Sequence, residues 1–206
     1  MTPDEVSALF TRADGTYCFA RWGRPIVPVV FGVEDASLGV LKGACEAVVA
    51  LAGHRMAETD PELGANLMVF FLTDWAELPQ VSGLDRLLPD LPRLVRRLQD
   101  AEANQYRAFR FDPDGAIQAA FVFLRMDESL SALSAEALAL GQMAQVILLW
   151  SDTAFRRQSP LALAGAHTVL RPDIAEVIRA AYDPVLPAKA NDASHALRLY
   201  ARMART

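Results

Sequence analysis

Several features are missing from this sequence, and each absence excludes a class of protein. Cysteine occurs only at Cys18 and Cys45, outside any C-x-x-C pair, so no zinc knuckle is predicted. No stretch reaches the roughly 18 uninterrupted apolar residues that a membrane helix needs. The first residues carry early acids and no apolar segment of the kind that secretory signals have. We therefore expect a cytoplasmic protein, without membrane insertion, whose two thiols lie in the core.

Positive charge is scarce as well. Lysine and arginine number 20 against 25 acidic residues, which gives a net charge of −5, and they form no basic stripe. Nucleic-acid binding is therefore not expected. The chain also contains no G-x-G-x-x-G, P-loop or G-x-S-x-G motif, which removes the usual nucleotide sites and the nucleophile elbow of many hydrolases.

What is present is a chain of ordinary globular composition. Of its 206 residues, 52% are apolar and 22% charged, which suffices for a real core. We expect a single domain over residues 1–206. The β signals are an extended aromatic stretch at 17–22, a β-branched run at 26–31, a buried apolar run at 66–72, and a hairpin of 106–112 and 116–124 around Pro113-Asp114-Gly115.

Details of these strands predict their places in the sheet. Pro28 cannot donate to a ladder, so its strand lies at an edge or begins there. The second hairpin arm is too apolar to alternate and should be central. On the first arm, Arg107, Phe109 and Phe111 share one face, and Arg110 lies on the other.

Helical patterns occupy much of the rest. A helix over about 36–52 starts at the N-cap Asp35 and ends at Gly53. Residues 84–103, interrupted by two prolines, are predicted as an exposed helical insertion. Further helices are expected from Ser134 to about residue 150, and in a tail over about 173–204. A mixed β-sheet with helices packed largely on one side is an α+β fold.

The segment 138–152, LALGQMAQVILLWSD, contains three exceptions to its apolar pattern: Gly141, Gln142 and Gln145. They have the i, i+1, i+4 spacing of the H-E-x-x-H helix of zinc peptidases. The simpler interpretation is that two buried glutamines hydrogen-bond a neighbouring strand edge or a water. In either case we expect helix 135–149 to be the most buried of the chain, with defined partners for both amides.

Three stretches carry a resemblance to a family: residues 141–152, residues 179–184 (RAAYDP), and Arg21-Trp22 followed by Pro25-Ile26. Together they resemble an uncharacterised family of bacterial proteins, many of them described as lipoproteins, which in turn resembles the zincin metallopeptidases of the gluzincin type. The resemblance implies a zincin-like sheet and active-site helix. It also implies that Gly141 stands at the first histidine, Gln142 at the catalytic glutamate, Gln145 at the second histidine, and Glu176 near the third ligand.

Those substitutions remove the peptidase chemistry. Zinc needs imidazole, thiolate or carboxylate ligands, and a neutral glutamine cannot take a proton from bound water. We therefore predict a non-catalytic zincin-like protein, without a cofactor, that acts by binding or assembly with a protein or small-molecule partner. Apolar residues within 146–155 and the aromatic hairpin suggest a possible homodimer.

The alternative is a hydrolase with an unorthodox site near His54, Glu58 and Asp60. His54 and Glu58 stand four residues apart with Asp60 close by, although exposed charged residues would produce the same pattern. The isolated His167 and His195 are not predicted to be ligands.

Overall fold

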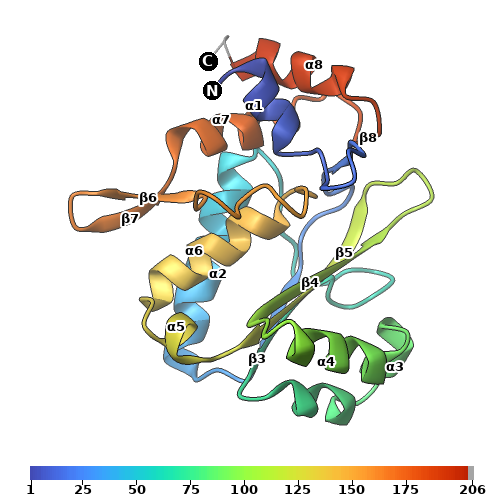
Figure 1. Cartoon of the computed structure of the whole chain (residues 1–206), viewed down its shortest axis with the longest axis vertical. Coiled ribbons are helices and arrows are strands. Elements are labelled where there is room, and N and C mark those ends of the chain that lie inside the picture. Colours follow the sequence, from blue (N-terminus) through green and yellow to red (C-terminus); the bar gives the residue numbers. More distant parts are fainter. Residues whose placement is uncertain (204–206) are drawn as a thin grey trace.

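The computed structural model describes residues 1–203, and it has the predicted α+β fold with a mixed sheet packed against helices (Figure 1). The sheet has the strand order β2-β3-β5-β4. Its strands are β2 (Pro28–Phe31), β3 (Leu67–Leu72), β4 (Gln105–Phe111) and β5 (Ile117–Arg125). The pairs β2–β3 and β3–β5 are parallel, and β4 joins β5 as the antiparallel arm of the predicted hairpin.

The sequence placed two of these strands correctly. Strand β2 begins at Pro28 and lies at the edge of the sheet. Strand β5 is central, and both of its faces are buried. Ala120, Val122 and Leu124 enter one hydrophobic cluster, whereas Phe121 and Phe123 enter a second cluster on the opposite face. A strand buried on both faces cannot alternate between apolar and polar residues.

One face of the sheet is covered by two long helices that lie side by side, α2 (Asp35–Leu51) and α6 (Ala135–Val146) (Figure 1). The N-cap of α2 is Glu34 rather than Asp35, and the chain leaves the helix through Gly53 at φ +64°. Helix α6 begins as predicted at Ser134, whose hydroxyl accepts a hydrogen bond from the Ala137 amide. It ends at Val146, earlier than the predicted residue 150.

The opposite face is covered by the segment predicted as an exposed insertion, and that prediction was wrong. The segment is helical, with α3 (Leu84–Leu87) and α4 (Leu91–Asp100) following the 3-10 helix η1 (Trp75–Gln80). These elements pack their apolar side chains on Phe121 and Phe123 of β5. Helices therefore lie on both faces of the sheet, which corrects the predicted one-sided packing, because a central strand that is apolar on both faces must be buried on both.

The two ends of the described chain meet above α2 and α6. Helix α1 (Pro3–Ala8) contacts α8 (Ser194–Met203), which in turn packs on α7 (Pro172–Ala181) (Figure 1). The sequence analysis missed α1, although Thr2 and Glu5 form a capping box. It also missed the short helix α5 (Glu128–Ser131) and the projecting hairpin of β6 (Leu161–Ala164) and β7 (His167–Leu170). Strand β1 (Phe19–Ala20) lies within the stretch 17–22 that was predicted as extended, but its partner β8 (Lys189–Ala190) was not predicted. Residue 204 of the predicted tail lies outside the described residues.

Both cysteines and the middle of the apolar segment 146–155 are buried. Cys18 and Cys45 are buried and free, as expected, and burial raises the pKa of Cys45 to about 12. Val146, Ile147 and Leu148 are at most 2% exposed, so these three residues of the segment 146–155 lie in the core and add no apolar surface. Within residues 1–203, no helix has the length and apolar character required to cross a membrane.

Candidate functional site: the cleft between β4 and α6

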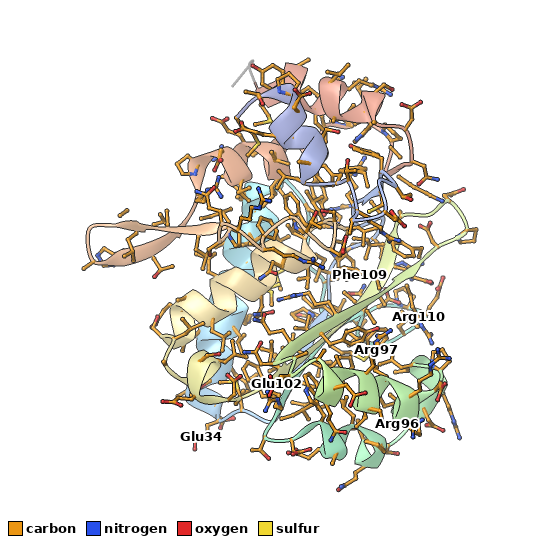
Figure 2. The ribbon with its side chains drawn as sticks, viewed as in Figure 1. Glu34, Arg96, Arg97, Glu102, Phe109 and Arg110 are labelled. Carbon is orange, nitrogen blue, oxygen red and sulfur yellow. The ribbon has the colours of Figure 1, made fainter. Side chains whose placement is uncertain are left out.

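A cleft of about 840 Å³ lies between strand β4, the end of helix α6 and the loop that follows it. We call it the β4–α6 cleft. Its strand wall comes from the face of β4 that carries Gln105, Arg107, Phe109 and Phe111. Phe109 lies on the α6 side of the strand, and Arg110 lies on the side of α3 and α4 (Figure 2). Because side chains alternate along a strand, β4 lines the cleft with one face and packs against the second hydrophobic cluster with the other.

Gln142 is tied to this wall through a three-residue network. The Arg107 guanidinium donates from Nη2 to Gln142 Oε1 at 2.5 Å and to Gln105 Oε1 at 2.8 Å. Gln142 Nε2 donates to the same Gln105 oxygen at 2.9 Å. Gln142 is only 3% exposed, so the expectation of a defined partner on a neighbouring strand is confirmed. The network fixes the buried middle of α6 to the edge strand β4.

The charge of Arg107 has no carboxylate partner among the described residues. Both of its hydrogen bonds go to neutral amide oxygens, and its Nε is shielded from solvent without an acceptor. Burial lowers the pKa of Arg107 to about 10, so the group remains a cation at neutral pH. A cation set this deeply without an anion is unfavourable for the protein alone.

Aromatic rings and further arginines complete the cleft. Phe109 and Phe111 stack at 6.5 Å between centroids on the strand side, and Trp150 and Phe155 meet edge to face at 5.1 Å on the loop side. The charged lining residues are three arginines, among them Arg107, and one aspartate that already pairs with one of the other two; they are Arg12, Arg107, Arg156 and Asp152. The cleft therefore combines apolar walls with excess positive charge in an acidic chain.

The other predicted site residues are only partly brought together. Gln145 lines the cleft, and its amide donates to the Gly141 carbonyl one turn back at 3.1 Å, which confirms a defined partner for it as well. Gly141 is directed toward β6 instead, since a Cβ placed on it would lie 3.5 Å from Leu161. Glu176, partly buried on α7, does not line the cleft. Gly141, Gln142, Gln145 and Glu176 therefore do not converge on one point in the part of the chain that the structure describes.

The stretches that carry the family resemblance meet at the end of α6. Trp22 Nε1 donates to the Val146 carbonyl at 2.8 Å, and the Tyr182 hydroxyl donates to the Ile147 carbonyl at 2.9 Å. Trp150 Nε1 donates to the Ala144 carbonyl at 2.9 Å. The last carbonyls of a helix have no partner within it, so these side chains terminate α6 at Val146. Trp22, Trp150 and Tyr182 therefore have a structural role that needs no metal.

The alternative site around His54, Glu58 and Asp60 forms no metal-binding group. His54 Nε2 bonds the Arg24 carbonyl oxygen at 2.8 Å, and burial lowers the pKa of the imidazole. Glu58 is exposed. Asp60 is 5% exposed and accepts hydrogen bonds from the Glu62 and Leu63 amides, both at 2.9 Å. Among residues 1–203, no three histidine, cysteine or acidic residues are placed to hold a metal ion.

Asp60 instead closes a local structural network. Its other oxygen accepts from Asn66 Nδ2 at 3.0 Å and pairs with Arg24 Nη1 at 3.3 Å. Burial opposes ionisation, but the surrounding N–H donors and Arg24 together hold the pKa of Asp60 below its ordinary value. Every donor around this carboxylate comes from the protein, so it holds the loop before β3 in place.

Comparison with protein-family models, curated proteins and solved structures found no match for this chain. The candidate site therefore depends on geometry alone. Sequence reasoning found Gln142 and Gln145, but it missed Gln105 and the role of Arg107. The available signal was the placement of Arg107 on one strand face with two phenylalanines, and its partner Gln142 lies 35 residues away.

Proposed function

We propose that the protein acts by binding a small molecule in the β4–α6 cleft, without catalysing a reaction on it. The observation that carries this proposal is the Arg107 cation, which has no carboxylate partner among the described residues and lines an aromatic-walled cleft. Ligand sites are typically concave and largely apolar, with a few polar groups that fix orientation. The expected location is the cytoplasm.

The nature of the polar groups supports binding rather than turnover. Gln142 and Gln145 are neutral amides, and the Gln142 amide is already engaged by Gln105 and Arg107. Neither side chain can act as a general base near neutral pH. The position of these amides also fits a zincin-like helix that has lost its metal, as the family resemblance implies. Metal analysis of protein purified without chelators should therefore find no stoichiometric zinc, and one tightly held zinc per chain would contradict the proposal.

The cleft can be tested directly with aromatic probes of different charge. Naphthalene-2-carboxamide, 2-naphthylmethylamine and naphthalene-2-carboxylate would be titrated calorimetrically into the protein at pH 7. Phe111 is 43% exposed, so Phe111→Glu changes the cleft without removing a core side chain. We expect this variant to lose binding of whichever probe the wild type takes.

The matched control is Leu38→Glu. Leu38 is 37% exposed and lines a separate groove of about 850 Å³ between β2 and α2. This variant introduces the same charge at similar exposure and should bind the probes as the wild type does. Binding that survives Phe111→Glu but is lost in Leu38→Glu would place the ligand in the other groove and overturn the assignment of the cleft.

A further inference from the structure

The donors that Arg107 leaves unused indicate what the cleft binds. Its Nη2 serves two amide oxygens, whereas neither Nε nor Nη1 donates to a protein acceptor among the described residues. Nε is shielded from solvent and therefore also from a ligand, whereas Nη1 is not among the shielded atoms and can donate to an acceptor from outside the chain. A guanidinium is matched best by an oxyanion, with which its hydrogen bonds are charge-assisted.

We propose that the β4–α6 cleft is a site for a flat organic monoanion, an aromatic or similarly planar carboxylate, whose charge pairs with Arg107. This inference rests on the proposed function and names its ligand class. The carboxylate would accept from Arg107, while the planar body lies between the phenylalanine pair of β4 and the Trp150–Phe155 pair of the loop.

The cations of the cleft differ in their exposure to solvent, and this difference favours one negative charge over two. Of the two other arginines in the lining, Arg156 is paired with Asp152 at 3.1 Å, and Arg12 is exposed, so solvent and salt screen its charge. Asp152 also accepts a hydrogen bond from the Ala13 amide, so its carboxylate is fixed at the rim. A phosphate dianion would meet one partly buried cation, Arg107, with only the exposed Arg12 as a further unpaired charge and the Asp152 carboxylate nearby. A carboxylate balances Arg107 without excess charge.

The same strand supplies a matched control. Arg110 lies on the opposite face of β4, where its guanidinium donates to the backbone carbonyls of Arg86 and Leu87. Arg107→Met and Arg110→Met therefore remove the same charge from the same strand, and only the first removes it from the cleft. Should Arg107→Met fail to fold, Arg107→Lys keeps the cation while removing the fork of donors.

The experiment is calorimetric titration of the wild type and the three arginine variants at pH 7 with naphthalene-2-carboxylate, its neutral carboxamide and 2-naphthyl phosphate. We expect the carboxylate to bind the wild type more tightly than either other probe. Arg107→Met should weaken it by about tenfold to a hundredfold, as expected for a charge-assisted hydrogen bond, and Arg110→Met should leave it unchanged. Arg107→Lys should give an intermediate affinity.

Several outcomes would overturn the assignment. Equal affinity for carboxylate and carboxamide, with no effect of Arg107→Met, would show a neutral ligand class while leaving the cleft itself as the binding site. Phosphate binding more tightly than carboxylate would contradict the monoanion. Carboxylate binding that persists in Phe111→Glu would locate the anion elsewhere and contradict the proposed function as well.

Discussion

Two arginines set into this protein have opposite surroundings. Arg24 pairs with the buried carboxylate of Asp60 at 3.3 Å and with Glu62 at 3.2 Å, so its charge is balanced by the chain. Arg107 is held by two neutral amides and has no acidic partner in residues 1–203. The charge of Arg24 is balanced by protein carboxylates without a ligand, whereas the guanidinium of Arg107 keeps N–H donors that have no protein acceptor. The difference separates a structural ion pair from a candidate binding group.

The two arginines also show that the candidate site lies near the glutamines of α6 rather than near His54. The acidic cluster near His54 looked reactive in the sequence, yet its hydrogen bonds are satisfied internally. The glutamines of α6 looked inert, yet one of them helps to hold the unpaired cation. Unsatisfied hydrogen-bonding capacity is therefore the more informative property here, and it depends on contacts between distant segments.

The largest expected effect on stability comes from Asp60→Ala, which removes the carboxylate at the centre of the Arg24–Asp60–Asn66 network. The substitution leaves Arg24, the Asn66 amide and two backbone amides without their acceptor. We expect the free energy of unfolding to fall by about 3 kcal/mol or more, as for other broken buried ion pairs. Chemical denaturation measures this change.

Glu62→Ala is the control for that measurement, because Glu62 pairs with the same arginine but its side chain is 62% exposed. Exposed ion pairs contribute little, so we expect a loss below about 0.5 kcal/mol. A similar loss in both variants would mean that Asp60 is no more important to the fold than a surface charge.

The next effect is a loss of folding stability at acidic pH, which we attribute to the buried imidazole of His195. His195 is 2% exposed, and the Tyr17 hydroxyl lies 3.1 Å from its Nδ1. Burial, helped by Arg198 and Arg202, lowers its pKa from 6.5 to about 4. Between these values the unfolded chain binds more protons than the folded one, so stability should fall as the pH drops from 6.5 to 4, by on the order of 2 kcal/mol.

His195→Gln should flatten that pH dependence, because it removes the titrating group and keeps a polar side chain. The control His167→Gln, at an exposed position of the β6–β7 hairpin, should retain the wild-type slope. The measurement is urea denaturation at several pH values between 4 and 7. Parallel curves for wild type and His195→Gln would contradict the predicted role of His195.

Local patterns allowed much of this fold to be predicted, and long-range contacts account for what was missed. Pro28, Ser134 and Gly53 each fix a strand or helix boundary through their own backbone chemistry, and they were read correctly. The position of residues 84–103 was missed because a leucine-rich amphipathic pattern shows that a face is buried but not which surface buries it. The partnership of Arg107 and Gln142 joins segments with no local signal between them.

A smaller effect on stability is expected from Arg107→Met. The variant loses two hydrogen bonds to amide oxygens, but it also removes a cation whose burial is uncompensated, and the Gln142–Gln105 bond can remain. We expect the free energy of unfolding to change by no more than about 1 kcal/mol, with stabilisation as the favoured direction.

The matched variant is Arg24→Met, which strands the buried Asp60 carboxylate and should cost about 2 kcal/mol. Thermal and chemical denaturation of the pair, without ligand, make the comparison. If Arg107→Met is the more damaging of the two, Arg107 is a structural residue and the contrast between the two arginines is lost.

The smallest effect expected is that of Gly141→Ala, which asks whether position 141 belongs to the cleft at all. The backbone of Gly141 is helical, and an added Cβ would meet Leu161 of β6 at an ordinary 3.5 Å. Alanine should therefore stabilise α6 by about 0.5–1 kcal/mol and leave naphthalene-2-carboxylate affinity unchanged.

Gly32→Ala is the contrasting control. Gly32 has φ +81°, and a Cβ there would lie 2.3 Å from the Phe71 carbonyl oxygen, so alanine should destabilise the protein. Thermal melts and the same titration decide the matter. A loss of affinity in Gly141→Ala would mean that this face of α6 is coupled to the cleft and that position 141 belongs to the site.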